Sequence, residues 1–263
     1  MTRRATTWVS AQLLFFATLV AAMASEPKRV MLLHSFGPDV KPWSDYARAI
    51  RAELSSQSPW ALDLHEHSLV TARFGDEGVE ASFVEYLRAL FAKQRLDLIV
   101  SIGAPAAGFV QRHRQKLFSD IPMVLTVVDQ RRVQYSTLTT NDAVVAVTIN
   151  YFRAFENILR VLPDTRTVSV VVGSSPIEQY WKKEIGNEVK PLANRISLIW
   201  YNEFSFKDIL KHAAALPPQS AIFWELMAVD AAGVPHEEGI ALTRLHAVAN
   251  APIFSYHGCL LRP

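Results

Sequence analysis

The chain has 263 residues, half of them hydrophobic, and its 27 basic and 25 acidic residues give a formal net charge of +2. This composition excludes a disordered chain and allows one large hydrophobic core or two smaller ones. The positive excess comes from Arg3 and Arg4, and the rest of the chain is neutral. A neutral body lacks the clustered positive charge of a nucleic-acid-binding protein, so we expect no nucleic-acid partner. Because Cys259 is the single cysteine, no intrachain disulfide can form.

The first 24 residues have the pattern of a secretory signal peptide. Arg3 and Arg4 precede an apolar run from Trp8 to Ala22, and small residues stand at Ala22 and Ala24. The apolar run has about 15 residues, whereas a membrane-spanning helix needs roughly 20. We therefore expect cleavage after Ala24 and a periplasmic location. The alternative is an uncleaved signal that anchors the protein in the membrane.

Strand-like runs alternate with segments of helical periodicity along the rest of the chain. Apolar or alternating runs predict strands at 30–36, 61–67, 97–102, 122–128, 143–149, 168–172, 196–201, 220–226 and 252–256. Apolar stripes at helical spacing predict helices at 43–54, 77–93, 103–117, 151–162, 176–189, 206–215 and 237–249. Strands that alternate with crossover helices of this length predict an α/β fold with mostly parallel sheets.

One strand-turn-helix pattern occurs twice in the sequence. Arg29–Trp43 and Thr167–Trp181 align without a gap and share a valine, a proline and a tryptophan at equivalent positions. The repeated opening predicts two similar lobes rather than one large sheet. We place the lobe boundary near Asn150. The predicted division is a signal peptide of residues 1–24, an N-terminal α/β lobe of residues 25–150 and a C-terminal α/β lobe of residues 151–263.

The loops at the C-terminal ends of the predicted strands form the candidate binding site, because open parallel sheets bind ligands there. Ser101 and Ser174 stand just before predicted helix starts, where free N–H groups and the helix dipole favour an anion such as a carboxylate. Trp200 and Trp224 are candidates to stack on an apolar ligand body. The predicted ligand-binding residues are Ser35, Phe36, Ser101, Gly103, Asp129, Ser174, Ser175, Trp200, Trp224 and Glu225. For each residue alone, a structural role in a turn or in the core is the alternative.

The sequence has no catalytic or phosphate-binding signature. No G-x-G-x-x-G follows a strand, and neither G-x-x-x-x-G-K-[ST] nor G-x-S-x-G occurs. His65 and His67 share one face of a predicted strand, but a metal would need a third ligand from elsewhere. We therefore expect no enzymatic activity, no metal and no cofactor. The alternative is an exported α/β serine hydrolase-like enzyme that uses Ser174 or Ser175 with His257.

Four segments between Lys28 and Tyr256 together resemble a known family. They are RVMLLHSFGPDVKPWSDYARAIRAEL, LPDTRTVSVVVGSSPIEQYWKKE, LPPQSAIFWELMAVDAAGVPHEE and ANAPIF. The chain is similar in these segments to the ABC-transporter-substrate-binding-like extracytoplasmic region of bacterial sensor histidine kinases, which resembles type I periplasmic binding proteins. The resemblance implies two Rossmann-like α/β/α lobes with parallel sheets and a hinge of crossing strands.

The resemblance also implies a function, which is ligand capture or sensing without catalysis. A small organic ligand, such as an amino acid or another carboxylate, would be held between the lobes, and the partner would be a membrane permease or a sensor histidine kinase. After ANAPIF the family continues with a segment that returns to the first lobe, and this sequence departs from that pattern. We therefore expect an incomplete second lobe, truncated before its closing return segment. A non-binding fragment that needs a partner chain is a further alternative.

Overall fold

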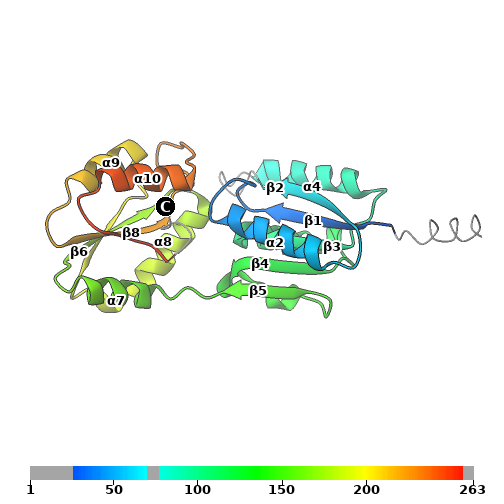
Figure 1. The fold of residues 1–263 in the computed structure, drawn as a ribbon, viewed down its shortest axis with the longest axis horizontal. Helices are drawn as coiled ribbons and strands as arrows, with labels where there is room; N and C mark the ends of the chain where they lie inside the picture. The colour runs from blue at the N-terminus through cyan, green and yellow to red at the C-terminus, as the bar shows by residue number, and fades with distance from the viewer. Residues whose placement is uncertain (1–25, 70–76, 257–263) are drawn as a thin grey trace, which may run out of the picture.

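The computed structural model describes residues 26–69 and 77–256, which form two α/β lobes that follow one another along the long axis of the molecule (Figure 1). One lobe has a five-stranded sheet in the order β2-β1-β3-β4-β5, and the other has a four-stranded sheet in the order β7-β6-β8-β9. Neighbouring strands pair in parallel throughout both sheets. The predicted fold class, two α/β lobes with parallel sheets, is confirmed, and the second sheet is the smaller of the two.

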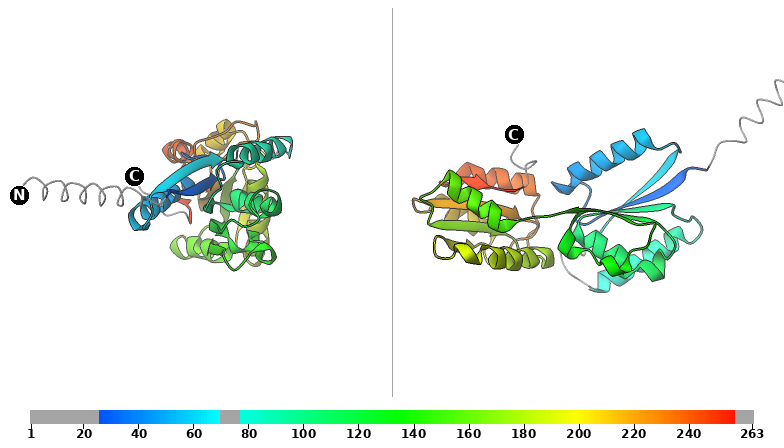
Figure 2. Two further views of the ribbon diagram at one scale, coloured as in Figure 1. Left: turned by 90° about the vertical axis from the view of Figure 1, so that its right-hand side faces the viewer. Right: turned by 90° about the horizontal axis from the view of Figure 1, so that it is seen from below.

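In the first lobe, helices cover both faces of the sheet. Its strands are β1 (Lys28–His34), β2 (Leu62–Ser68), β3 (Leu98–Ile102), β4 (Met123–Asp129) and β5 (Ala143–Val147). Its helices are α2 (Trp43–Gln57), α4 (Glu77–Phe91), α5 (Ala104–Arg112) and α6 (Arg114–Leu117), followed by the 3₁₀ turns η1 (Gln130–Arg132) and η2 (Tyr135–Thr137). Helix α2 lies on the side of the sheet opposite to α4 and α5 (Figure 2).

Period-2 alternation decides which core each residue of β1 joins. Val30 and Leu32 face Ile50 and Leu54 of α2, whereas Met31 and Leu33 belong to the core on the other face. Because both faces of the sheet are covered by helices, the sequence of β1 is a continuous apolar run and does not alternate between apolar and polar residues. Helix α2 leaves part of its face open, as an apolar groove of about 820 Å³ beside it.

The second lobe repeats this arrangement around β6. Its strands are β6 (Thr167–Val172), β7 (Ser197–Trp200), β8 (Ser220–Leu226) and β9 (Ile253–Phe254). Its helices are α7 (Tyr151–Val161), α8 (Pro176–Val189), α9 (Phe206–Ala214) and α10 (Glu238–Val248), with the 3₁₀ turn η3 (Lys190–Leu192) after α8. Helices α7 and α8 pack on one face of the sheet, and α9 and α10 pack on the other.

The connection from β5 to α7 carries the chain from one lobe to the other (Figure 1). Asn150 accepts a hydrogen bond from the Arg153 N–H and so caps α7. The predicted lobe boundary near Asn150 falls in this connection and stays a prediction. In residues 26–69 and 77–256 no helix is both long and apolar enough to cross a membrane. The predicted signal peptide lies outside the described residues.

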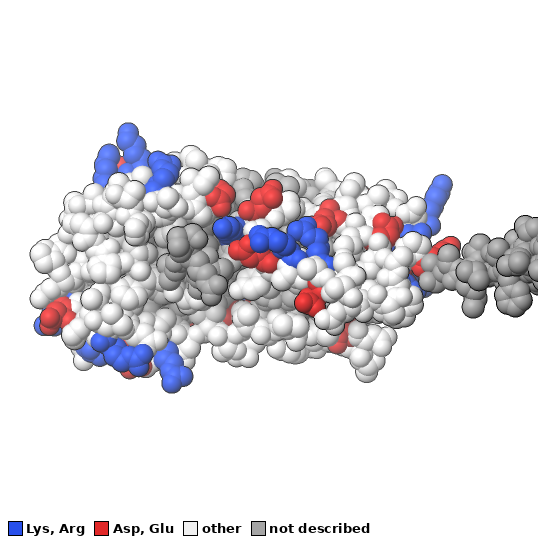
Figure 3. Space-filling model, in the orientation of Figure 1, with Lys and Arg blue, Asp and Glu red and all other residues white. Residues whose placement is uncertain are grey.

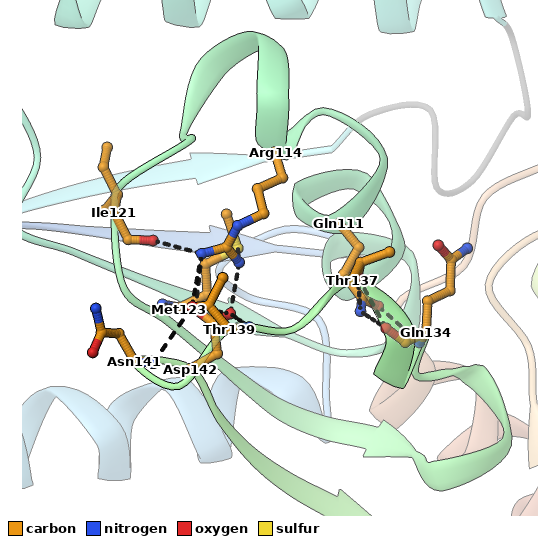
Figure 4. Close-up of polar contacts among 9 residues, drawn as sticks. All are labelled: Gln111, Arg114, Ile121, Met123, Gln134, Thr137, Thr139, Asn141 and Asp142. Atoms are coloured by element: carbon orange, nitrogen blue, oxygen red, sulfur yellow. Dashed lines mark hydrogen bonds and ion pairs between the residues drawn. The ribbon is translucent and has the colours of Figure 1, made fainter.

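A buried ion pair fixes the loop between β4 and β5 in the first lobe (Figure 4). The Arg114 guanidinium donates to the Asp142 carboxylate at 2.7 Å, and their side chains are 6% and 0% exposed. The same carboxylate accepts from the backbone N–H groups of Met123 at 2.9 Å and Thr139 at 2.6 Å. Burial alone would raise the pKa of Asp142, but these hydrogen bonds outweigh it and lower the pKa.

Candidate functional site

A cavity of about 310 Å³ lies between the two lobes, at the C-terminal ends of the strands where an open parallel sheet binds ligands. We call it the interlobe cavity. The first lobe and the connection to α7 supply Phe36, Pro42, Trp43, Asp45, Tyr46, Ala104, Pro105, Val127, Asp129, Val147, Thr148 and Ile149. The second lobe supplies Ile177, Trp181 and Tyr256.

Aromatic rings from both lobes dominate the wall of the interlobe cavity. Phe36 and Trp43 pack with ring centroids 4.4 Å apart. Tyr46 lies in the first turn of α2, as Trp43 does. Across the cavity, Trp181 on α8 and Tyr256 after β9 complete the wall. Such a lining provides a large apolar contact area for a flat or apolar ligand body.

The turn after β3 forms part of the cavity wall. Two of the predicted ligand-binding residues, Ser35 and Gly103, stabilise this turn. The Ser35 hydroxyl donates to the Ile102 carbonyl at 2.7 Å and accepts from the Ala106 N–H at 3.0 Å. Gly103 has a φ of +92°, and an added Cβ would lie 2.6 Å from Ser35 Oγ and 3.0 Å from Trp43 Nε1. Ser35 and Gly103 therefore hold α5 against β1, with Ala104 and Pro105 exposed to the cavity.

Replacing Gly103 with alanine is expected to lower the free energy of unfolding by about 2 kcal/mol, because the new Cβ adds a steric clash to an unfavourable backbone conformation. Gly233 is the matched control, because its φ is +77° but nothing lies within 4 Å of an added Cβ. Gly233→Ala should therefore cost about 1 kcal/mol. Urea unfolding of both variants measures the difference, and equal losses would contradict close packing of Gly103 on Ser35.

Backbone strain occurs at the same edge of the cavity, in β4. Val127 has a φ of 52°, which a β-branched residue rarely adopts, and it stands at an irregularity between Thr126 and Val128. Strained conformations of this kind are held by their surroundings and concentrate at functional sites. Val127 lines the interlobe cavity, so the strain lies in its wall.

Comparison with known proteins gives structural relatives only. No protein-family model matches the chain, and no curated protein matches it. A solved ABC domain from Streptococcus pneumoniae, described as in complex with L-Trp, has a TM-score of 0.59 and 12% identity over 90% of this chain and 76% of its own. A conserved domain protein from Vibrio cholerae has a TM-score of 0.60 and 15% identity, with the same coverage. An ABC transporter solute-binding protein from Conexibacter woesei has a TM-score of 0.52 and 14% identity, covering 86% and 69%.

The chain has the fold of an ABC-transporter solute-binding protein. The fold that the sequence resemblance implies is thereby confirmed. The interlobe cavity lies between the lobes of this solute-binding fold, where the resemblance places the ligand.

One arginine of the solute-binding fold joins the two lobes beside the cavity. Arg131, just after β4, contacts both carboxylate oxygens of buried Asp129 at 2.8 Å. Its guanidinium also reaches α8 of the second lobe, where it bonds Glu184 at 3.1 Å and Glu188, and it lies 5.6 Å from the ring centre of Trp181. The hydrogen bond to Asp129 is the main cause that raises the pKa of Arg131. We call this group the Arg131 bridge.

A buried glutamate lies behind the second-lobe wall. Glu225 on β8 is 1% exposed, and its Oε1 accepts from the Tyr151 hydroxyl at 2.8 Å and the Tyr256 hydroxyl at 3.1 Å. Its Oε2 has no hydrogen-bond partner among the described residues. Burial, with a smaller effect from nearby Glu178, raises the pKa of Glu225 to about 8. Glu225 therefore supports Tyr256 from behind as a neutral acid, and does not itself line the cavity.

The turn before α8 is held by internal hydrogen bonds. The Ser174 hydroxyl donates to the carbonyl of Asp230 at 2.7 Å, and the Ser175 N–H donates to Glu178 at 2.9 Å. The serine-hydrolase alternative needs a histidine base at this turn. Its candidate, His257, lies outside the described residues, and the Ser174 hydroxyl is already directed to a backbone oxygen.

The structure brings some of the predicted ligand-binding residues to the cavity and leaves others elsewhere. Phe36 and Asp129 line it, and Ser35 and Gly103 form the turn behind its wall. Ser101 is buried within β3, and Ser174 and Ser175 hold the turn before α8. Trp224 is fully buried beneath α9 and α10, and Trp200 lies on edge strand β7 with Lys182 5.9 Å from its ring.

Four aromatic residues of the lining were absent from the predicted site, and three of them carried a signal in the sequence. Trp43 and Trp181 are the equivalent tryptophans of the repeated strand-turn-helix pattern, and the structure places both in the cavity wall. Tyr256 carried a different signal, because it stands at the C-terminal end of the last predicted strand, and Tyr46 carried none.

No group of three potential metal ligands occurs among residues 26–69 and 77–256. Charges of both signs are interspersed over the first lobe on the face shown in Figure 3, without a single-sign patch there.

Proposed function

We propose that the protein is an extracytoplasmic solute-binding protein that captures a small organic ligand between its two lobes and is not an enzyme. The interlobe cavity carries this proposal, because its aromatic wall is built by both lobes and lies at the strand ends. The solved structures of similar fold support it, since one is described with L-Trp and another, from Actinobacillus succinogenes with a TM-score of 0.50 and 16% identity, with D-allose.

The mechanism would be closure of the lobes on the ligand. A flat ligand body would contact Phe36 and Trp43 of the first lobe and Trp181 and Tyr256 of the second. Such a ligand favours the closed arrangement only by the difference between its affinities for the two arrangements. Export through the signal peptide of residues 1–24 would deliver the protein to the periplasm. A membrane permease, or a sensor histidine kinase, would there receive the ligand or the closure signal.

The proposal is tested by screening the protein without residues 1–24 against amino acids, amines, sugars and organic acids. Thermal shift and tryptophan fluorescence should both respond to at least one compound, because Trp43 and Trp181 line the cavity. A folded sample that responds to none of these classes would contradict a solute-binding function.

Replacing Trp43 with alanine is expected to weaken binding of the compound found in this screen by about tenfold, because one side of the aromatic wall is removed. Trp60→Ala is the control, since Trp60 is 52% exposed and lines the groove beside α2 instead. Calorimetric titration measures both affinities, and thermal unfolding checks that both variants are folded. Equal affinities of the Trp43→Ala variant and the unmodified protein would place the ligand elsewhere.

A further inference from the structure

The charged groups of the interlobe cavity are all acidic among the residues that the structure describes. Asp45 and Asp129 line it, and no lysine, arginine or histidine does. The two carboxylates differ in their availability. Asp129 is 2% exposed and held through both oxygens by Arg131, so its charge is already compensated.

Asp45 is the carboxylate that a ligand can engage. Its side chain is 31% exposed, and its partner Arg48, which is 68% exposed, forms a surface pair within one helix. Exposed pairs of this kind contribute about 0–1 kcal/mol, so a ligand cation competes with Arg48 at small cost.

The aromatic wall suits a cation for a second, independent reason. The face of a tryptophan or tyrosine ring attracts an ammonium group through its quadrupole, and rings arranged around a cavity recognise organic cations in this way. Trp43 and Tyr46 belong to the same helix turn as Asp45, so aromatic rings and a carboxylate stand side by side in the wall.

Donors for an anion are in short supply at the two helix starts that face the cavity. At α5, the Gly103 N–H donates to the Thr126 carbonyl, the Ala106 N–H donates to Ser35, and Pro105 has no N–H. Among the described residues, only the Ala104 N–H in this first turn has no acceptor. The start of α8 is similar. The N–H groups of Ser174 and Ser175 donate to Val229 and Glu178, and Pro176 has none. The Ile177 N–H is the one donor of this first turn without an acceptor among the described residues. Each helix start therefore offers an anion a single N–H group, which reduces the usual advantage of a helix N-terminus.

We propose that the interlobe cavity selects ligands that carry a protonated amino group on an aromatic body, with Asp45 as the ion-pair partner, over ligands with a carboxylate at the same place. This inference rests on the proposed solute-binding function and narrows its ligand class. It departs from the sequence-based expectation of a carboxylate, because that expectation assumed that most N–H groups at the two helix starts are free.

Two probes of equal shape and opposite charge test the charge preference. Tryptamine and indole-3-propionate share the indole ring and a two-carbon chain, and end in an ammonium group and a carboxylate respectively. In calorimetric titrations at low salt, tryptamine should bind at least about tenfold more tightly. The inference is overturned if indole-3-propionate binds as tightly, or if neither probe binds. A neutral or anionic ligand from the metabolite screen would also overturn it, while leaving the proposed function intact.

Replacing Asp45 with asparagine tests the assigned partner without a change of shape. The Asp45→Asn variant should bind tryptamine about tenfold more weakly, whereas any affinity for indole-3-propionate should stay equal or increase. Glu53→Gln is the control, because Glu53 lies on the same helix but lines the groove outside the interlobe cavity. Unchanged tryptamine affinity in a folded Asp45→Asn variant would remove Asp45 from the site.

Discussion

Replacing Asp142 with alanine is expected to lower the free energy of unfolding by about 3–5 kcal/mol, because it leaves the Arg114 guanidinium buried without its counter-charge. It also removes the acceptor for the N–H groups of Met123 and Thr139, which hold the loop between β4 and β5. Both side chains of the pair are almost completely buried, so water cannot replace the lost partner. Urea unfolding followed by circular dichroism measures the loss.

Asp120→Ala is the matched control, since Asp120 is an exposed aspartate in the same lobe, and it should change stability by less than about 0.5 kcal/mol. The double variant Asp142→Ala with Arg114→Met should recover part of the loss, because methionine leaves no buried charge. A loss from Asp142→Ala no larger than that from Asp120→Ala would show that the pair does not stabilise the fold.

Glu225 is expected to make the protein less stable as the pH rises from about 4.5 to about 8. Its pKa is about 8 in the folded protein and 4.5 ordinarily, so in this range the folded protein holds a proton that the unfolded chain releases. The free energy of unfolding therefore falls as the pH rises, by about 5 kcal/mol for Glu225 alone, and levels off above the folded pKa. Burial also raises the pKa of Glu178, which adds a contribution of the same sign.

Comparison with Glu225→Gln isolates the contribution of Glu225. The amide oxygen can still accept from Tyr151 and Tyr256, but the side chain does not titrate. Urea unfolding at pH 5, 7 and 9 should show a smaller decline for this variant, and greater stability than the unmodified protein at pH 9. Glu156→Gln, on the exposed face of α7, is the control and should leave the decline unchanged. Parallel pH profiles for Glu225→Gln and the unmodified protein would contradict a buried neutral carboxyl.

The architecture could be predicted from the sequence because it follows from short-range patterns. The continuous apolar run at 30–36 indicates a strand covered on both faces, and the restart at Thr167 indicates a second sheet. The position of Trp224 could not be predicted in this way. Every residue of β8 is buried, so its sequence does not reveal which face a given side chain joins. Trp224 packs under α9 and α10, whereas its neighbour Phe223 faces α7 and α8.

The candidate site was harder to predict because it depends on contacts between distant segments. Glu225 meets Tyr151 from the start of α7 and Tyr256 from after β9, and no local spacing encodes this meeting. The same holds for Ser35, whose hydroxyl is used by the turn after β3 instead of facing a ligand. The side chains at strand ends could be listed from the sequence. Whether each one is free to contact a ligand depends on its hydrogen-bond partners, which the sequence does not show.

Under the proposed solute-binding function, the Arg131 bridge would affect how tightly a ligand is held. The measured affinity for a ligand is lower than its affinity for the binding-competent arrangement of the lobes when only a fraction of the molecules have that arrangement. Glu184 and Glu188 bond Arg131 from a helix of the opposite lobe, and Glu188 also accepts from the backbone N–H of Tyr151, where the connecting segment enters that lobe. If the lobes open and close as proposed, these carboxylates outside the cavity wall would favour the arrangement in which Arg131 contacts α8. Changes at Glu184 or Glu188 would then alter the affinity for a ligand while the aromatic wall, and with it the choice of ligand, stays the same.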